Sequence, residues 1–154
     1  MHNKKVLVSY AWVRSSWAMI RNLAQYGLTV YAADKQRVFM SRYSRYCAGC
    51  LQYPDYQEDE AGFIGALRDF ILAENIGTYI PSHEDGFVVA RNHNAFPDSV
   101  KIPVSDYDKI DILHHKGKAQ KLAEKLGIPH PRSYCLSGKD DLYERLPEMP
   151  EKGV

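Results

Sequence analysis

Residues 6–34 read VLVSYAWVRSSWAMIRNLAQYGLTVYAAD, and this stretch decides the fold class. Val6–Val8 and Leu28–Ala33 are short apolar runs rich in β-branched residues, which is typical of buried strands. Gly27 stands where a helix commonly ends in a left-handed conformation. Between the two runs, apolar residues recur at helical spacing and give one apolar face: Trp17, Ile20, Leu23 and Ala24. These residues predict a βαβ unit, whose right-handed crossover makes its two strands parallel.

The same alternation of strand and helix signals continues along the chain. We expect a helix that contains Phe63–Ile71 and ends near Gly77, and helix starts at two capping-box patterns, Ser82 with Asp85 and Ser105 with Asp108. Further expected elements are a short helix within Phe39–Tyr46 and strands over Cys47–Tyr53, Thr78–Pro81 and Val100–Val104. The pattern predicts an α/β fold: a Rossmann-like, open, mostly parallel sheet with helices on both faces.

Composition narrows the function classes. The 154 residues are 45% hydrophobic and 25% charged, with a formal net charge of +1. A near-neutral chain gives no indication of a nucleic-acid or membrane surface. No apolar run approaches the roughly 20 residues that cross a bilayer. The N-terminal residues show no signal-peptide pattern, and three cysteines, an odd number, fit a reducing compartment, so we expect a cytoplasmic protein.

The loop after the first strand, Ala11–Ser16, is the first candidate site, because ligands of open α/β sheets bind beyond the carboxyl ends of the strands. It contains no glycine, so the dinucleotide fingerprint is absent. It offers instead a helix N-terminus with Arg14, Ser15 and Ser16, a combination that suits a carboxylate or phosphate. The alternative is that Ser15 or Ser16 only caps the helix and that Arg14 is a solvated charge.

The loop after the fourth strand, Ser82–Asp85, is the second candidate. If Ser82 caps the following helix, Asp85 is its reciprocal partner and has a structural role. Glu84 has no such role and can accept a hydrogen bond from a substrate amine, although the helix dipole alone also accounts for an acid there. His83 is expected to be a loop histidine rather than a catalyst.

Three further groups receive structural interpretations. Cys47 and Cys50 form a C-x-x-C pair without a second pair, so we expect neither zinc nor a thioredoxin-type site, and His114–His115 is expected to be a helix end rather than a metal pair. An aromatic cluster with Arg42 and Arg45 nearby has some likeness to a stacking platform for single-stranded nucleic acid, but packing at the sheet edge is the expected role of Tyr43, Tyr46, Tyr53 and Tyr56.

A family resemblance rests on several segments taken in order. They are residues 16–24 (SWAMIRNLA), 30–34 (VYAAD), 41–47 (SRYSRYC), 80–85 (IPSHED), the helix that opens at Lys116 and the GIPHPRSY hinge at 127–134. Together they resemble the front half of ATP-grasp proteins, in the subgroup similar to the carbamoyl-phosphate synthase large chain. The resemblance implies a biotin-carboxylase-like N-terminal (pre-ATP-grasp) domain over residues 1–115, followed by a hinge helix and the start of a truncated ATP-grasp domain over 116–154.

What the resemblance implies about function is an ATP-dependent ligase. ATP and Mg²⁺ would activate a carboxylate as an acyl phosphate, which an amine or other nucleophile would attack. The front module would bind the small-molecule substrate through Arg14, Ser15, Ser16 and Glu84, and Lys116 would touch an ATP phosphate. His115 stands where the family usually has an acid.

The same resemblance places the family's glycine loop, strand lysines and magnesium-binding acids beyond Val154. We therefore expect this polypeptide alone to contain no catalytic or metal-binding residue, to bind ATP and Mg²⁺ at most weakly and to be inactive without a C-terminal ATP-grasp domain. A homodimer is a further expectation.

Two other classes of function remain open. One is a free-standing Rossmann-type module for a small ligand or nucleotide, with Asp34 on a ribose. The other is a domain whose exposed sheet edge pairs with another subunit.

Overall fold

The computed structural model describes residues 3–131, 134, 136 and 138–148. The chain divides into two compact units, residues 1–110 and 111–154, and the division falls within α4 (Tyr107–His114). Each unit is described by itself.

The first unit is built on a parallel sheet. Within the described residues the sheet has four strands in the order β3-β2-β1-β4: β1 (Lys5–Val8), β2 (Thr29–Asp34), β3 (Gly49–Gln52) and β4 (Thr78–Ile80). All three neighbouring pairs are parallel, and Val6 of β1 lies opposite Val30 of β2 and Thr78 of β4. The fold class predicted from the sequence is confirmed.

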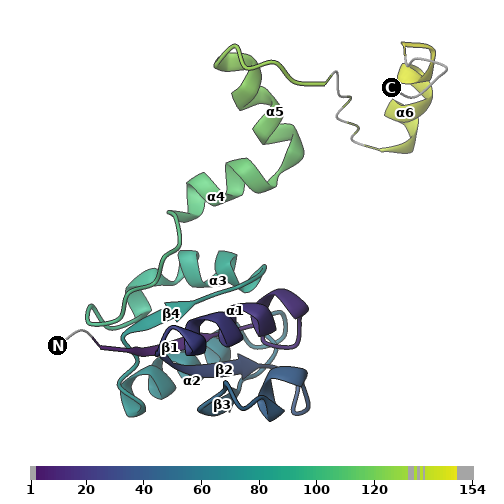
Figure 1. The fold of residues 1–154 in the computed structure, drawn as a ribbon. Helices are drawn as coiled ribbons and strands as arrows, with labels where there is room; N and C mark the ends of the chain where they lie inside the picture. The colour runs from purple at the N-terminus through teal and green to yellow at the C-terminus, as the bar shows by residue number, and fades with distance from the viewer. Residues whose placement is uncertain (1–2, 132–133, 135, 137, 149–154) are drawn as a thin grey trace. The chain divides into compact units, whose positions relative to one another are not determined.

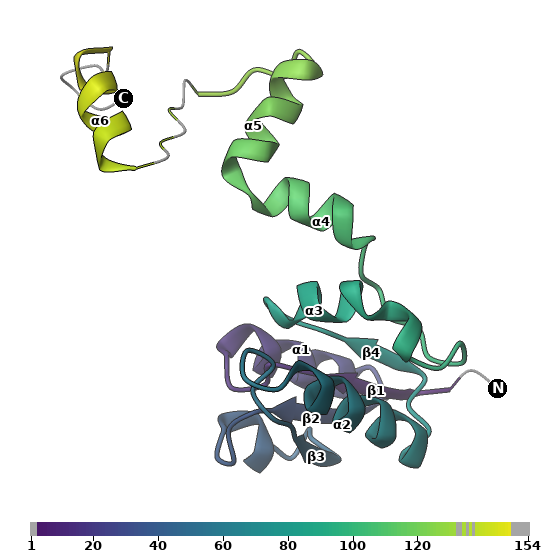
Figure 2. The same ribbon diagram turned by 180° about the vertical axis from the view of Figure 1, so that it is seen from behind.

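Helices cover both faces of this sheet. Helix α1 (Arg14–Gln25) packs on one face (Figure 1), and α2 (Glu60–Ala73) packs on the other, where Figure 2 shows it in front of the strands. Side-chain alternation along β1 explains the two layers: Val6 and Val8 join the core under α1, while Leu7 joins the core under α2 and α3 (Asp85–Arg91). Single turns occur at η1 (Met40–Tyr43) and η2 (His93–Ala95).

Helix boundaries follow the sequence signals only in part. Gly27 adopts a positive φ of 81° just after α1, as predicted, and Asp59 caps α2 by accepting from the amide of Gly62. The N-cap of α1 is Val13, which makes no side-chain cap bond, so the prediction that Ser15 or Ser16 caps this helix is wrong.

The expected strand at Val100–Val104 is reduced to one isolated bridge. Lys101 pairs with Thr78, donating its amide to the Gly77 carbonyl at 3.0 Å and accepting from the Tyr79 amide at 2.9 Å. Pro103 has no N–H to continue the ladder, which accounts for the early end.

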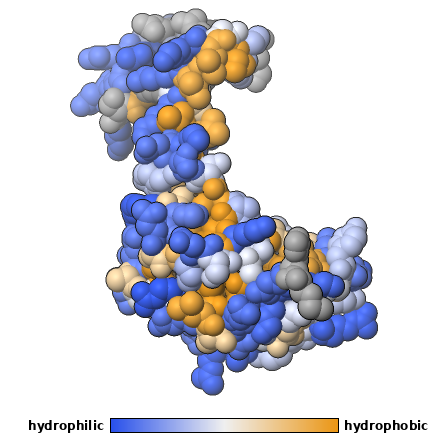
Figure 3. Space-filling model, turned by 90° about the vertical axis from the view of Figure 1, so that its left-hand side faces the viewer, coloured by the Kyte–Doolittle hydropathy of each residue, from blue (hydrophilic) through white to orange (hydrophobic). Residues whose placement is uncertain are grey.

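The second unit carries the last residues of α4, then α5 (Lys116–Lys125), α6 (Lys139–Arg145) and the turn η3 (Leu146–Glu148). None of the residues of these three helices is buried. Exposed apolar side chains occur in both units, for example Val38 and Leu72 in the first and Leu113 and Leu126 in the second. Figure 3 shows orange apolar patches interrupted by hydrophilic surface on one side of the molecule. No described helix is long and apolar enough to span a membrane.

The hinge predicted after α5 begins as expected. Gly127 has a positive φ of 66°, and its amide donates to the Glu124 carbonyl at 3.1 Å, which closes the helix. Residues 128–131 carry no regular structure. Parts of the extended segment expected next, and most of the tail expected at 147–154, lie outside the described residues.

Candidate functional site

Two loops meet at the carboxyl edge of the sheet, residues 9–13 after β1 and residues 81–84 after β4. They are neighbours because β1 and β4 are adjacent parallel strands. Serine hydroxyls connect them: Ser82 donates to the Ser9 carbonyl at 2.6 Å, Ser16 donates to the Tyr10 carbonyl at 2.8 Å, and the Ser16 and Ser82 hydroxyl oxygens lie 2.6 Å apart. We call these two loops, with the first turns of α1 and α3, the edge site.

This network corrects the second capping prediction. Ser82 does not cap α3, whose N-cap is Glu84. The hydroxyls of Ser16 and Ser82 form hydrogen bonds within and between the two loops, and the two serines are 66 residues apart in the sequence. A capping pattern and a tertiary hydrogen bond need the same small hydroxyl side chain, and the local sequence does not distinguish them.

A buried carboxylate lies beneath the edge site. Asp85 is fully buried; its Oδ1 accepts from the His83 amide at 3.0 Å and its Oδ2 accepts a short hydrogen bond from the Ser9 hydroxyl. The Ser9 hydroxyl also lies 2.9 Å from the Tyr79 hydroxyl. Burial raises the pKa of Asp85, since the charged form loses water. Asp85 therefore has a structural role, but its partners are His83 and Ser9 rather than a capping Ser82, so the predicted capping-box role is wrong.

Asp34 fixes the first loop from the end of β2. Its two carboxylate oxygens accept from the backbone amides of Trp12, at 3.0 Å, and Gln36, at 2.8 Å. Burial raises its pKa, and only 1% of the residue is exposed. A side chain that is so enclosed and already bonded is poorly placed to bind a ribose, which counts against the nucleotide-module alternative.

Aromatic rings line the edge site, a feature that the sequence reasoning missed. The Tyr10 ring stacks on His83, with ring centroids 4.5 Å apart and an angle of 8° between the ring planes. Trp12 is 48% exposed, and its ring centroid lies 6.3 Å from that of Tyr10. Tyr10 has a φ of 55°, uncommon for a bulky residue, and its amide donates to the Tyr53 hydroxyl at 3.1 Å. The sequence holds one signal for the unusual Tyr10 backbone. Residues 9–13 contain no glycine, so a left-handed position in this loop has to fall on a residue with a side chain.

The predicted substrate-binding residues divide into exposed and buried ones. Arg14 and Ser15 are exposed and are the first two residues of α1. No side-chain oxygen caps this helix and no acid lies in its first turn, so its amide end suits an anion. Glu84 is exposed at the start of α3 and makes no cap bond. Ser16 is fully buried, so it positions the loop and is not available to a ligand.

Lys116, the predicted phosphate contact, lies in the second unit. It is exposed and opens α5 after the N-cap residue His115. Its neighbours form a small ion cluster in which Asp111 accepts from Lys118 and lies 3.4 Å from His115 Nε2. Lys118 lowers the pKa of Asp111 through that hydrogen bond.

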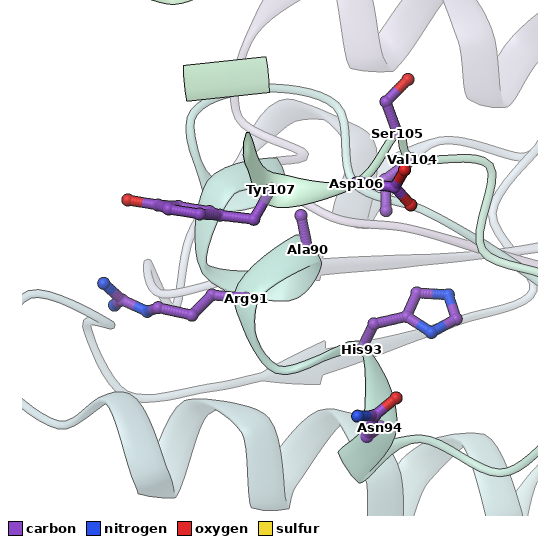
Figure 4. A pocket seen from close by; sticks show the side chains of 8 residues that line it. All are labelled: Ala90, Arg91, His93, Asn94, Val104, Ser105, Asp106 and Tyr107. Atoms are coloured by element: carbon purple, nitrogen blue, oxygen red, sulfur yellow. The ribbon is translucent and has the colours of Figure 1, made fainter. Parts of the chain in front are cut away.

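A hollow in the first unit is a separate feature. It has a volume of 290 Å³ and lies between the C-terminal end of α3 and the segment that leads into α4, among Arg91, His93, Asp106 and Tyr107 (Figure 4). Arg91 is engaged there, since it pairs with Glu60 and lies 5.9 Å from the centroid of the Tyr107 ring. None of the predicted site residues lines this hollow.

The expected packing of the tyrosine cluster holds for some members only. Tyr53 is buried and meets Phe63 edge-on at 4.8 Å, and Tyr56 lies 5.5 Å from the same ring. Tyr43 is 73% exposed, and Tyr46 lies under the Arg45 guanidinium at 4.9 Å.

Comparisons with known proteins concern the fold. No protein-family model matches the sequence, and no curated protein matches it. Solved structures do: an L-amino acid ligase from Bacillus licheniformis has a TM-score of 0.68 at 14% identity, over 85% of this chain and 32% of that one. The biotin carboxylase domain of a single-chain bacterial carboxylase has a TM-score of 0.61 at 15% identity, over 94% and 34%.

A third solved structure is the biotin carboxylase domain dimer of Hydrogenobacter thermophilus 2-oxoglutarate carboxylase, in complex with MgADP, ADP and bicarbonate. Its TM-score is 0.62 at 15% identity, over 96% of this chain and 33% of that one. This chain has the fold of the N-terminal regions of these enzymes. It spans about a third of the length of each.

Proposed function

We propose that this chain is the substrate-binding front module of an ATP-grasp ligase that joins a carboxylate to an amine. The observation that carries the proposal is the edge site, where the Ser16 and Ser82 hydroxyls join two loops. The first loop presents Arg14 at an uncapped helix end, and the second presents the exposed carboxylate of Glu84. The shared fold with an L-amino acid ligase and biotin carboxylases supports it.

The proposed roles follow from the chemistry of each group. Arg14, Ser15 and the first amides of α1 hold the substrate carboxylate, because charge-assisted donors converge there. Glu84 accepts from an ammonium group. Ser16, which is buried, holds the loop in place. A zwitterionic amino acid offers both charges, so free amino acids are the substrate class that this arrangement fits best.

The phosphoryl-transfer part of the reaction is assigned elsewhere. In the proposed reaction the carboxylate takes the terminal phosphoryl group of ATP and releases ADP, and an amine then displaces phosphate. Among the described residues no group of three or more His, Cys, Asp or Glu side chains could hold a metal ion. We assign ATP and Mg²⁺ to a separate ATP-grasp domain, with Lys116 contributing a phosphate contact.

Calorimetric titration of the chain with free L-amino acids tests the substrate assignment. The tightest binder is then compared with its methyl ester, which removes the carboxylate charge, and its N-acetyl derivative, which removes the ammonium charge. Arg14→Gln should weaken binding of the free acid by about tenfold, the effect of one charge-assisted contact, and should hardly affect the ester. Glu84→Gln should act in the same way on the amine, with the N-acetyl compound unaffected.

Matched control substitutions are available at exposed positions of α2, outside the edge site. Arg68→Gln and Asp69→Asn each remove a charge of the same sign as the test variants do, and both should leave amino-acid binding unaltered. If esterification weakens binding to wild type and to Arg14→Gln by the same factor, Arg14 does not recognise the carboxylate, and the assignment is wrong.

A further inference from the structure

Two thiols meet where the chain enters β3, on the α1 side of the sheet. The sulfur atoms of Cys47 and Cys50 lie 3.6 Å apart, and both cysteines are free and half-buried. The sequence reasoning treated this C-x-x-C pair as structural or incidental, because it enters a strand rather than opening a helix. The structure shows a close dithiol at this position.

Backbone hydrogen bonds hold the two thiols in this arrangement. The Cys47 amide donates to the Ser44 carbonyl at 3.0 Å, and the Ala48 amide donates to Val30 at 2.8 Å, which starts the pairing of β3 with β2. Cys50 then lies opposite Ala32 in the ladder. Both side chains pack against the core that α1 covers. The two sulfur atoms, 3.6 Å apart, are farther from each other than the about 2.05 Å of a disulfide bond. Rotation of the two side chains can close this difference.

The two sulfurs differ in chemical character. The hydrogen bond from Cys50 lowers the pKa of Cys47 to about 7, and the same contact raises the pKa of Cys50. The positive charge of Arg42 also favours the Cys47 thiolate. Since the thiolate is the nucleophile in disulfide exchange, Cys47 is the attacking group and Cys50 is the resolving one.

We propose that Cys47 and Cys50 form a redox site that exchanges reversibly with low-molecular-weight disulfides such as oxidised glutathione. The Cys47 thiolate attacks one glutathione sulfur, forms a mixed disulfide and releases a glutathione thiolate. Cys50 then gives up its proton to solvent and attacks Cys47 Sγ, which forms the Cys47–Cys50 bond and releases the second glutathione. The protein dithiol is oxidised, and one glutathione disulfide is reduced to two thiols.

Mass spectrometry of the full chain after equilibration in glutathione redox buffers tests the proposal. The expected product has lost two hydrogens, and proteolytic mapping should find one peptide pair linked through Cys47 and Cys50. Cys135→Ser, which removes the third cysteine, should leave this product unchanged. Reduction with dithiothreitol should restore the original mass.

The single variant Cys50→Ser tests the exchange step. It should accumulate the mixed disulfide at Cys47 and stop there, because the resolving thiol is absent. The proposal is overturned if the mapped link involves Cys135, if the wild type gives only mixed disulfides, or if Cys50→Ser forms no mixed disulfide at Cys47. Circular dichroism of each variant confirms that it is folded.

Discussion

Replacing Ser16 by alanine probes the connection between the two loops of the edge site. Three hydrogen bonds compete for two hydroxyl protons: Ser16 to the Tyr10 carbonyl, Ser82 to the Ser9 carbonyl, and the contact between the two hydroxyls. The variant leaves Ser82 bonded to Ser9, so it removes the donor for one part-buried carbonyl, that of Tyr10, rather than three bonds. The expected loss is about 1–2 kcal/mol of unfolding free energy, the cost of leaving one such group unsatisfied.

Ser15→Ala is the matched control, since Ser15 is the adjacent residue of the same helix and is exposed. The change in helix propensity is the same in both variants and cancels in the comparison. Surface substitutions of this kind stay within about 0.5 kcal/mol. Urea denaturation of the wild type and both variants measures the difference. Equal stabilities for Ser15→Ala and Ser16→Ala would refute the claim that the Ser16 hydroxyl holds the loop.

Three further expectations concern the first unit. Burial raises the pKa of Asp85, so the folded chain retains a proton that the unfolded chain loses. The unfolding free energy therefore falls as pH rises from the ordinary carboxyl pKa of about 3.9 to the raised pKa of Asp85. Asp85→Asn should reduce this dependence of stability on pH in urea titrations, and an unchanged dependence would contradict the burial argument. Gly65→Ala should stabilise the protein by about 0.4–1 kcal/mol, because a Cβ on this residue of α2 meets open space. Gly27→Ala should destabilise the protein by about 1 kcal/mol, because Gly27 has a φ of 81°. The melting temperatures of the two variants should therefore shift in opposite directions. Leu67→Ala should cost about 2–5 kcal/mol, because Leu67 is fully buried, and a calorimetric loss below about 1 kcal/mol would show that the core under α2 is misassigned.

The fold could be predicted from the sequence because its signals are local. The strand at Val6–Val8, the helix after it and the left-handed Gly27 each follow from a few neighbouring residues, and all are present. The order of the strands in the sheet could not be predicted in this way, because the placement of β4 beside β1 depends on contacts between residues about 70 positions apart. No local pattern encodes that pairing.

The surroundings of the candidate residues could be predicted only in part. The strand ends direct attention to the loops after β1 and β4, and Arg14 and Glu84 are exposed there. The Ser16 hydroxyl was expected at a substrate, and the nucleotide-module alternative placed Asp34 on a ribose. Both side chains are buried and bonded to the chain itself. Residues of these types serve a cap, a loop or a ligand equally well, and only the tertiary neighbours decide between these uses.

The central claim is that the edge site binds an amino acid, and mapping by NMR tests it most directly. Backbone amide spectra of the chain are recorded while a free L-amino acid is added. The account predicts that the shifted amides cluster in residues 10–16 and 82–86, and that Arg14→Gln and Glu84→Gln each reduce those shifts at the same ligand concentration. Shifts centred on the hollow around Arg91 and Tyr107, or no shifts with any amino acid, would contradict it.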